Sequence, residues 1–160
     1  MKVQIISLAL ATLAFGFFNA CEQGDTQKPI IDLVEPEEGD LLAIGHEHGV
    51  HLEMKLSDND ALNSYRVQIH NAFDGHPHQE TRSDDPEPFF YDSVFTDIQG
   101  KRNTHIHHHA IVIPEGVAEG NYHLEVRCLD VSGNEAYAFR NVRLGHEEDD
   151  DHHDEDEHED

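Results

Sequence analysis

The chain has no tryptophan, two cysteines and only ten lysine and arginine residues among its 160. Those ten bases stand against 34 acidic residues, which leaves a formal net charge of −24. Phosphate binding needs a basic surface, so this charge excludes nucleic acid as a partner. With 37% hydrophobic residues, the chain is too apolar for full disorder, and its length suits one domain.

Common catalytic motifs are also absent from the sequence. It contains no Gly-x-Ser-x-Gly, no His-Glu-x-x-His, no phosphate-binding loop and no dinucleotide-binding glycine pattern. A hydrolytic zinc centre with Glu125 or Asp74 beside it is an alternative, but no residue indicates a substrate. We therefore expect a protein that is not an enzyme.

The N-terminal segment has the pattern of a secretory signal peptide over residues 1–20. Met1 and Lys2 precede an apolar run over 5–18, which is too short to span a bilayer. The following Asn19-Ala20-Cys21 resembles the lipobox of bacterial lipoproteins. This resemblance implies that Cys21 is lipidated, that 21–27 form a linker to the membrane, and that Glu22 directs the protein to the outer membrane, facing the periplasm or the surface. Ordinary secretion is the alternative.

The last fifteen residues, 146–160, are Asp, Glu and His alone. Such a segment cannot form a core, and we expect a disordered tail. Its histidines are candidate metal ligands, because imidazole binds zinc, copper and nickel. They are His146, His152, His153 and His158. A solubilising tail without specific metal binding is the alternative.

The middle of the chain, 28–145, alternates apolar and polar residues in short runs separated by turn residues. This pattern predicts an all-β domain, and seven strands at this spacing predict a single seven-stranded immunoglobulin-like β-sandwich. The expected strands cover 29–34, 50–56, 65–70, 89–95, 104–113, 122–128 and 135–144. Cys128 shares its parity with Tyr122, Leu124 and Val126, so we expect a buried, inert thiol.

Three histidine-bearing motifs resemble a family of bacterial lipoproteins classed as a domain of unknown function. They are the run from His70 to His78 with its central Phe73-Asp74-Gly75, then Thr104-His105-Ile106-His107, and Tyr122-His123. The similarity covers about residues 29 to 144. It implies the fold and the location in the cell envelope, and no established activity.

Strand parity predicts that several histidines gather at one end of the sandwich. Successive loops of a seven-stranded antiparallel sandwich alternate between its two ends, which groups His46, His48, His51, His70, His76, His78 and His123. The third and sixth strands are neighbours in this fold, so His70 and His123 should face each other at about 5 Å.

Two imidazoles at that separation can share a metal ion. We expect a third ligand from His76 or His78 and a fourth from Asp74, His46, His48 or water, which suits a tetrahedral zinc site. Copper and nickel remain alternatives. So does a set of surface histidines without any metal.

A second histidine cluster lies at residues 105–109, where the odd positions share one strand face. Ile111 and Ile113 have the same parity and look buried, so either a bulge intervenes or the imidazoles approach the core. We include His107 and His109 as further ligands. If 89–95 form a strand, this cluster starts away from His70.

Calcium is the competing ion, because oxygen-bearing side chains gather in two turns, at Asp58, Asn59, Asp60 and at Asp130, Asn134. Turn formation explains the same residues more simply. The sequence thus predicts a lipid-anchored envelope protein that captures, buffers or delivers zinc, copper or nickel, with a transporter or receptor as a further partner. The alternative is an immunoglobulin-like module that binds a protein or a glycan.

Overall fold

The structure is a computed structural model that describes residues 24–72 and 86–147. Every regular element in these residues is a strand, as the alternating pattern predicts. The strands are β1 (Ile30–Glu35), β2 (Leu41–Ala43), β3 (Val50–Ser57), β4 (Leu62–Asn71), β5 (Tyr91–Phe95), β6 (Asn103–Ile111), β7 (Gly120–Asp130) and β8 (Glu135–Gly145). Within the same residues, no helix is long and apolar enough to cross a membrane.

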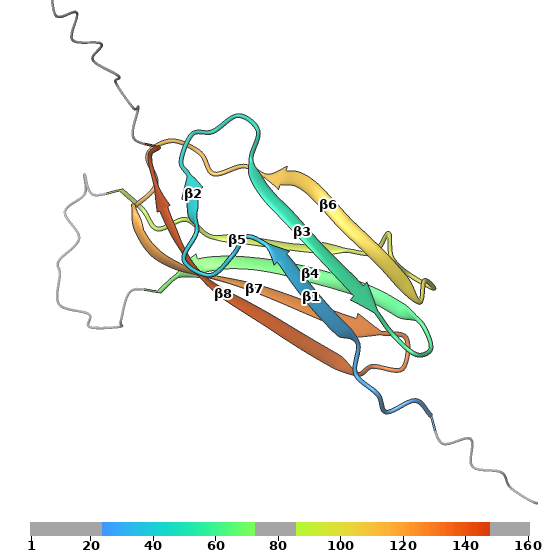
Figure 1. Cartoon of the computed structure of the whole chain (residues 1–160). Helices are drawn as coiled ribbons and strands as arrows, with labels where there is room; N and C mark the ends of the chain where they lie inside the picture. Colours follow the sequence, from blue (N-terminus) through green and yellow to red (C-terminus); the bar gives the residue numbers. More distant parts are fainter. Residues whose placement is uncertain (1–23, 73–85, 148–160) are drawn as a thin grey trace, which may run out of the picture.

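The eight strands of the described residues form two sheets, which lie as two layers (Figure 1). One sheet has three strands in the order β1-β3-β6, and the other has five in the order β2-β8-β7-β4-β5. All neighbours are antiparallel except β2, which runs parallel to β8.

The prediction of seven strands is wrong by one, because β2 had not been expected. This strand has three residues and pairs from Leu41↔Arg143 to Ala43↔Gly145. A segment so short cannot show an alternating pattern, so its place in the sheet depends on tertiary pairing with β8. The other seven strands each correspond to an expected one, with bounds that shift by up to three residues, as at Leu62.

The inner faces of the two sheets share one hydrophobic core. In β3 the buried residues alternate with polar ones, and in β7 four side chains of one parity are fully buried. They are Val50, Leu52, Met54 and Leu56 in β3, and Tyr122, Leu124, Val126 and Cys128 in β7. Burial of a large apolar side chain contributes about 1.5–3 kcal/mol. The core thus fixes which side chains point outward, and the histidines are among them.

The expectation of a buried thiol at Cys128 is confirmed. The side chain is 0% exposed and carries a free thiol. Burial, with the nearby Asp58 and Asp130 carboxylates, raises the pKa of this thiol to about 12. It therefore stays protonated at neutral pH, and a protonated thiol is a poor nucleophile and a poor metal ligand.

Candidate metal centre

Three histidines come together on the outer face of the three-stranded sheet. His51 belongs to β3, and His107 and His109 belong to β6. One ring nitrogen of each lies within 4.8 Å of the other two, and all three side chains are exposed. This is a set of nitrogen donors within reach of a common ion.

The pairing of β3 with β6 explains this arrangement. Glu53 lies opposite His107, and Leu52 lies opposite His108. The next pair along the ladder is Val50 with Ile111. Between these two pairs, β3 spans two residue steps, from Leu52 to Val50, whereas β6 spans three, from His108 to Ile111. The extra residue is a β-bulge.

The bulge decides between the two alternatives that the sequence left open. Ile106 and Ile111 are both buried, although their parity differs, while His107 and His109 stay exposed. The register shift therefore keeps the odd histidines on the outer face. His108 alone turns partly inward, and burial lowers the pKa of its imidazole.

Gly49 holds the two strands close at the bulge. Its φ is +69°, in the left-handed region that favours glycine. A Cβ atom at this position would lie 2.4 Å from the carbonyl oxygen of His109 and 2.7 Å from that of Ile111. Only a residue without a side chain allows this approach, which positions His109 beside His51.

The rings of the trio lie close to one another. The centroids of His51 and His109 are 4.9 Å apart with the rings nearly parallel, at 9°. Those of His51 and His107 are also 4.9 Å apart, at 56°. Nitrogens bound to one tetrahedral zinc ion lie about 3.4 Å apart, and the exposed rings are free of the core and can rotate to that separation.

Glu53 supplies negative charge beside the trio. Its Oε1 atom is 2.9 Å from Nε2 of His105, and its Oε2 atom is 3.8 Å from Nε2 of His51. The hydrogen bond with His105 lowers the pKa of Glu53. The carboxylate is therefore ionised at neutral pH, where it favours a cation at the site or can act as a ligand.

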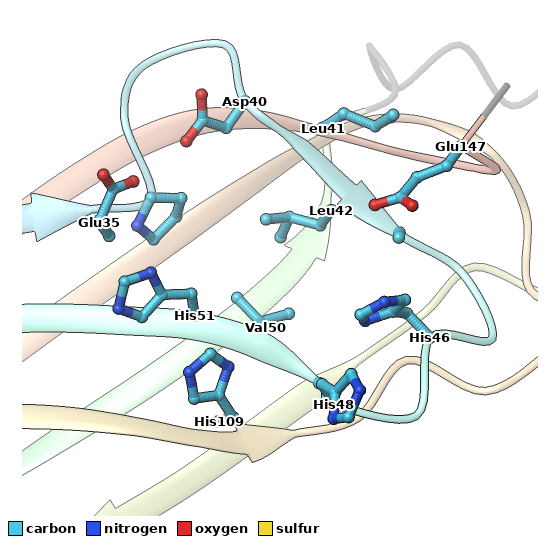
Figure 2. A pocket seen from close by; sticks show the side chains of 13 residues that line it. Glu35, Asp40, Leu41, Leu42, His46, His48, Val50, His51, His109 and Glu147 are labelled. Atoms are coloured by element: carbon cyan, nitrogen blue, oxygen red, sulfur yellow. The ribbon is translucent and has the colours of Figure 1, made fainter. Parts of the chain in front are cut away.

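A pocket of about 250 Å³ adjoins the trio and includes two of its members, His51 and His109 (Figure 2). His46 and His48 line the same pocket, with ring centroids 5.3 Å apart. Its acidic lining residues are Glu35, Asp40 and Glu147. The predicted ligands His46 and His48 thus lie on the same side of the domain as His107 and His109.

His70 and His123 form a separate pair. They face each other across β4 and β7, as the sequence predicts, and their ring centroids are 5.5 Å apart. The Nδ1 atom of His70 is buried, and among the described residues it has no hydrogen-bond partner. This pair belongs to the five-stranded sheet. Of the histidines predicted at one end, His51 lies on the three-stranded sheet, His70 and His123 lie on the five-stranded sheet, and His46 and His48 lie between β2 and β3.

Several predicted ligands cannot be placed. His76, His78, His152, His153 and His158 lie outside the described residues, and so does the predicted lipidation site Cys21. His146 is described, and its Nε2 atom is 3.7 Å from Oε1 of Glu119.

The sequence prediction did not include His51 or Glu53 among the ligands. The alternating pattern of β3 places both residues on the face opposite Leu52 and Met54, which is the sequence feature that could have identified them. That signal becomes informative only with the pairing of β3 and β6, which brings them beside His107. Parity along one strand does not reveal the neighbour across the sheet.

These features define a two-sheet, all-β protein with a histidine cluster on one outer face. The chain belongs to the family described as a domain of unknown function, DUF4625, whose model matches residues 19–145. No curated protein matches it.

Among solved structures, the chain is similar to wild-type OgpA from Akkermansia muciniphila, at 7% identity and a TM-score of 0.42, over 76% of this chain and 30% of that one. It is also similar to catalytically inactive OgpA from the same organism in complex with an O-glycopeptide substrate, glycodrosocin, at 12% identity and a TM-score of 0.37, over 79% and 32% of the two chains. The chain thus spans about a third of the length of these proteins.

Proposed function

We propose that the protein binds a transition metal ion, zinc in the first place, through His51, His107 and His109. The observation that carries this proposal is the convergence of their three ring nitrogens within 4.8 Å on one sheet face. Three imidazoles with water or Glu53 as fourth ligand make a tetrahedral donor set that zinc favours. Copper and nickel also bind imidazole and remain the competing ions.

The neighbourhood of the trio supports the proposal. The ionised Glu53 hydrogen-bonds His105, and its Oε2 atom lies 3.8 Å from Nε2 of the proposed ligand His51. Carboxylates beside metal-bound imidazoles can orient and polarise them. The adjoining pocket adds His46, His48 and three carboxylates. A cation that approaches this side of the domain meets imidazoles and negative charge together.

We further infer that the two sheets form an immunoglobulin-like sandwich. Strands β1, β3 and β6 match A, B and E of the immunoglobulin fold, and β4, β7 and β8 match C, F and G. Strand β5 extends the second sheet beside β4, where variable-type domains add a strand, and β2 is added at the other edge. The hydroxyl of Tyr122, near the start of β7, donates a hydrogen bond of 2.7 Å to the carbonyl oxygen of Ala118 four residues upstream. This contact resembles the tyrosine corner of that fold.

In the proposed role, the protein captures, buffers or delivers metal at the cell envelope and catalyses no reaction. A lipid on Cys21 would hold it at the outer membrane. The tail histidines, His146, His152, His153 and His158, would add low-affinity sites from which the folded site is loaded. An envelope transporter or receptor would then be the partner that receives the ion.

Zinc titration of the full chain by calorimetry tests the proposal. We expect His107→Ala to weaken the tightest site by at least about 100-fold, since even outer-shell changes cost 10–100-fold in affinity. His123→Ala on the other sheet is the matched control and should bind like the wild type. Loss of the tight site in His123→Ala, or in neither variant, would contradict the proposal.

A second function is favoured by exposed aromatic side chains on the five-stranded sheet. The rings of Tyr137 and Phe139 stack with centroids 6.4 Å apart, and these residues are 48% and 57% exposed. Exposed aromatic residues are enriched at binding surfaces. In this alternative the protein binds a protein or glycan partner through that face, and His107→Ala leaves the binding intact.

A further inference from the structure

Three aspartates converge at the end of the domain opposite the histidine trio. Asp25 precedes β1, Asp58 follows β3 and Asp130 ends β7. One carboxylate oxygen of each lies within 4.8 Å of those of the other two. Oxygens bound to one Ca²⁺ at about 2.4 Å can be at most about 4.8 Å apart. The separation suits a single calcium ion.

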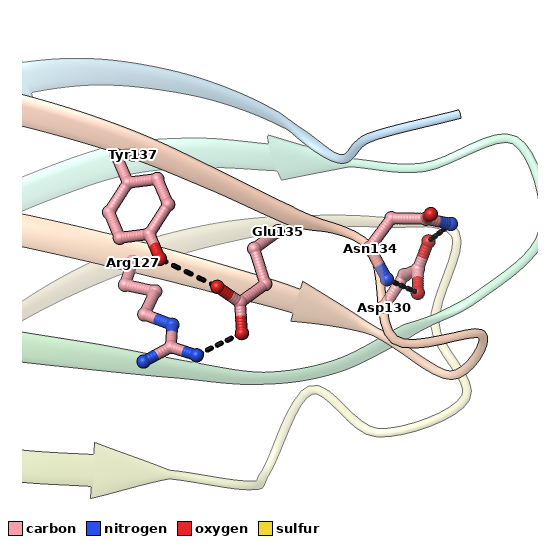
Figure 3. A network of polar contacts seen from close by, with 5 residues as sticks. All are labelled: Arg127, Asp130, Asn134, Glu135 and Tyr137. Carbon is pink, nitrogen blue, oxygen red and sulfur yellow. Dashed lines mark hydrogen bonds and ion pairs between the residues drawn. The ribbon is translucent and has the colours of Figure 1, made fainter. Parts of the chain in front are cut away.

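Turn hydrogen bonds hold all three carboxylates in place. Oδ1 of Asp25 accepts a bond of 3.0 Å from the backbone amide of Gln27. Oδ1 of Asp58 accepts a bond of 2.9 Å from the backbone amide of Asp60. Oδ1 of Asp130 accepts bonds of 2.8 Å from the amides of Ser132 and Asn134, and the Asn134 side chain donates to its Oδ2 atom (Figure 3). Turn formation therefore explains these contacts, as the sequence predicts.

Turn formation does not explain the remaining carboxylate oxygens of the cluster. The Oδ2 atoms of Asp25 and Asp58 are buried, and neither has a hydrogen-bond partner among the described residues. Nor does any ion pair found in residues 24–72 and 86–147 involve the three aspartates. Buried carboxylate oxygens without a hydrogen-bond partner destabilise a fold, the more so when the carboxylates have no counter-charge. A cation would supply both the contact and the charge.

We propose that Asp25, Asp58 and Asp130 bind a calcium ion. Carboxylate oxygens are the ligands that Ca²⁺ prefers, and water completes its flexible coordination sphere. Asp25 is already held at this end, because the side-chain nitrogen of Asn134 donates to its carbonyl oxygen at 3.1 Å. The ion joins the segment before β1 to the ends of β3 and β7. It therefore fixes the position of that segment relative to the two sheets.

Thermal unfolding of the full chain, followed by circular dichroism with and without calcium, tests this site. We expect calcium to raise the Tm of the wild type saturably, as any ligand of the native state does. Asp58→Asn should weaken the apparent calcium affinity at least tenfold and raise the Tm in chelator, because asparagine keeps the turn bond to Asp60 and removes one charge from the cluster. Asp25→Asn should also weaken binding, and its position outside the strands leaves the sheets intact.

Asp60→Asn is the matched control, because it removes the same charge from the same turn while its exposed side chain lies outside the cluster. It should respond to calcium as the wild type does, and the acidic tail contributes equally to every variant. The proposal is overturned by a wild type without a saturable response, by Asp58→Asn with wild-type affinity, or by equal losses in Asp58→Asn and Asp60→Asn. An equal or larger response to magnesium would assign the site to the smaller ion and contradict the calcium proposal.

Discussion

Replacement of Tyr122 by phenylalanine removes one buried hydroxyl and measures what that group contributes to stability. The side chain is 0% exposed, and its oxygen accepts a bond of 3.1 Å from the backbone amide of Phe89 while it donates to Ala118 at 2.7 Å. Two connecting segments, before β5 and before β7, are therefore held by one phenol group. Phenylalanine keeps the ring and removes both bonds.

The expected loss of stability depends on whether the two hydrogen-bond partners of the hydroxyl, the Phe89 amide and the Ala118 carbonyl, can find a replacement. Phe89 is 8% exposed, so its amide is left unsatisfied at a cost of about 1–3 kcal/mol. Ala118 is only partly buried, so its carbonyl can recover a bond to water, and its loss adds little to the cost. We expect a loss of about 2 kcal/mol in the free energy of unfolding, or a Tm lower by about 8 °C for a domain of this size.

Urea unfolding followed by far-ultraviolet circular dichroism measures this loss, with the slope m unchanged. Tyr137→Phe is the control. It also removes a hydroxyl that donates a hydrogen bond, of 2.6 Å to Glu135, but on an exposed face, and should cost less than about 0.5 kcal/mol. A loss below that value in Tyr122→Phe would refute the account of the two clamped segments.

Three further predictions concern the histidine site and its strand. Gly49→Ala should lower both stability and zinc affinity, the latter at least tenfold, since its Cβ would meet the His109 carbonyl. Gly116→Ala, at a φ of +78° with nothing within 4 Å, should lower stability alone. Calorimetry measures the zinc affinity of each variant, and urea unfolding measures its stability. Burial lowers the pKa of His108, so the unfolded chain binds the proton first. Stability should therefore fall as pH drops below about 6.5, and His108→Gln should flatten that fall in unfolding measured across pH. Zinc affinity, measured by titration at several pH values, should fall on acidification, because metal binding needs neutral imidazole. An affinity unchanged by pH would indicate carboxylate ligands.

Much of the fold could be predicted from the sequence because alternation along a strand reports burial directly. Val50, Leu52 and Met54 identify both the strand and its inner face, and the outer position of His107 follows from similar reasoning once the bulge is allowed. Strand β2 could not be predicted, because three residues are too few to show an alternating pattern. Its position depends on pairing with β8, which is a property of the folded chain.

The candidate sites were less predictable, because each depends on segments far apart in sequence. His51 and His109 meet through the pairing of β3 with β6 and the close approach at Gly49. Asp25 meets Asp58 through the position of the segment before β1. Strand parity assigned His109 to a face, and residue type assigned Asp58 to a turn. Neither pattern could say which residues share a neighbour.

The most direct test of the central claim is anomalous diffraction at the zinc absorption edge, from crystals of the protein grown with zinc. The account predicts an anomalous peak at about 2.0–2.1 Å from one nitrogen each of His51, His107 and His109. A peak bridging His70 and His123, with none at the trio, would contradict it and place the metal site on the five-stranded sheet.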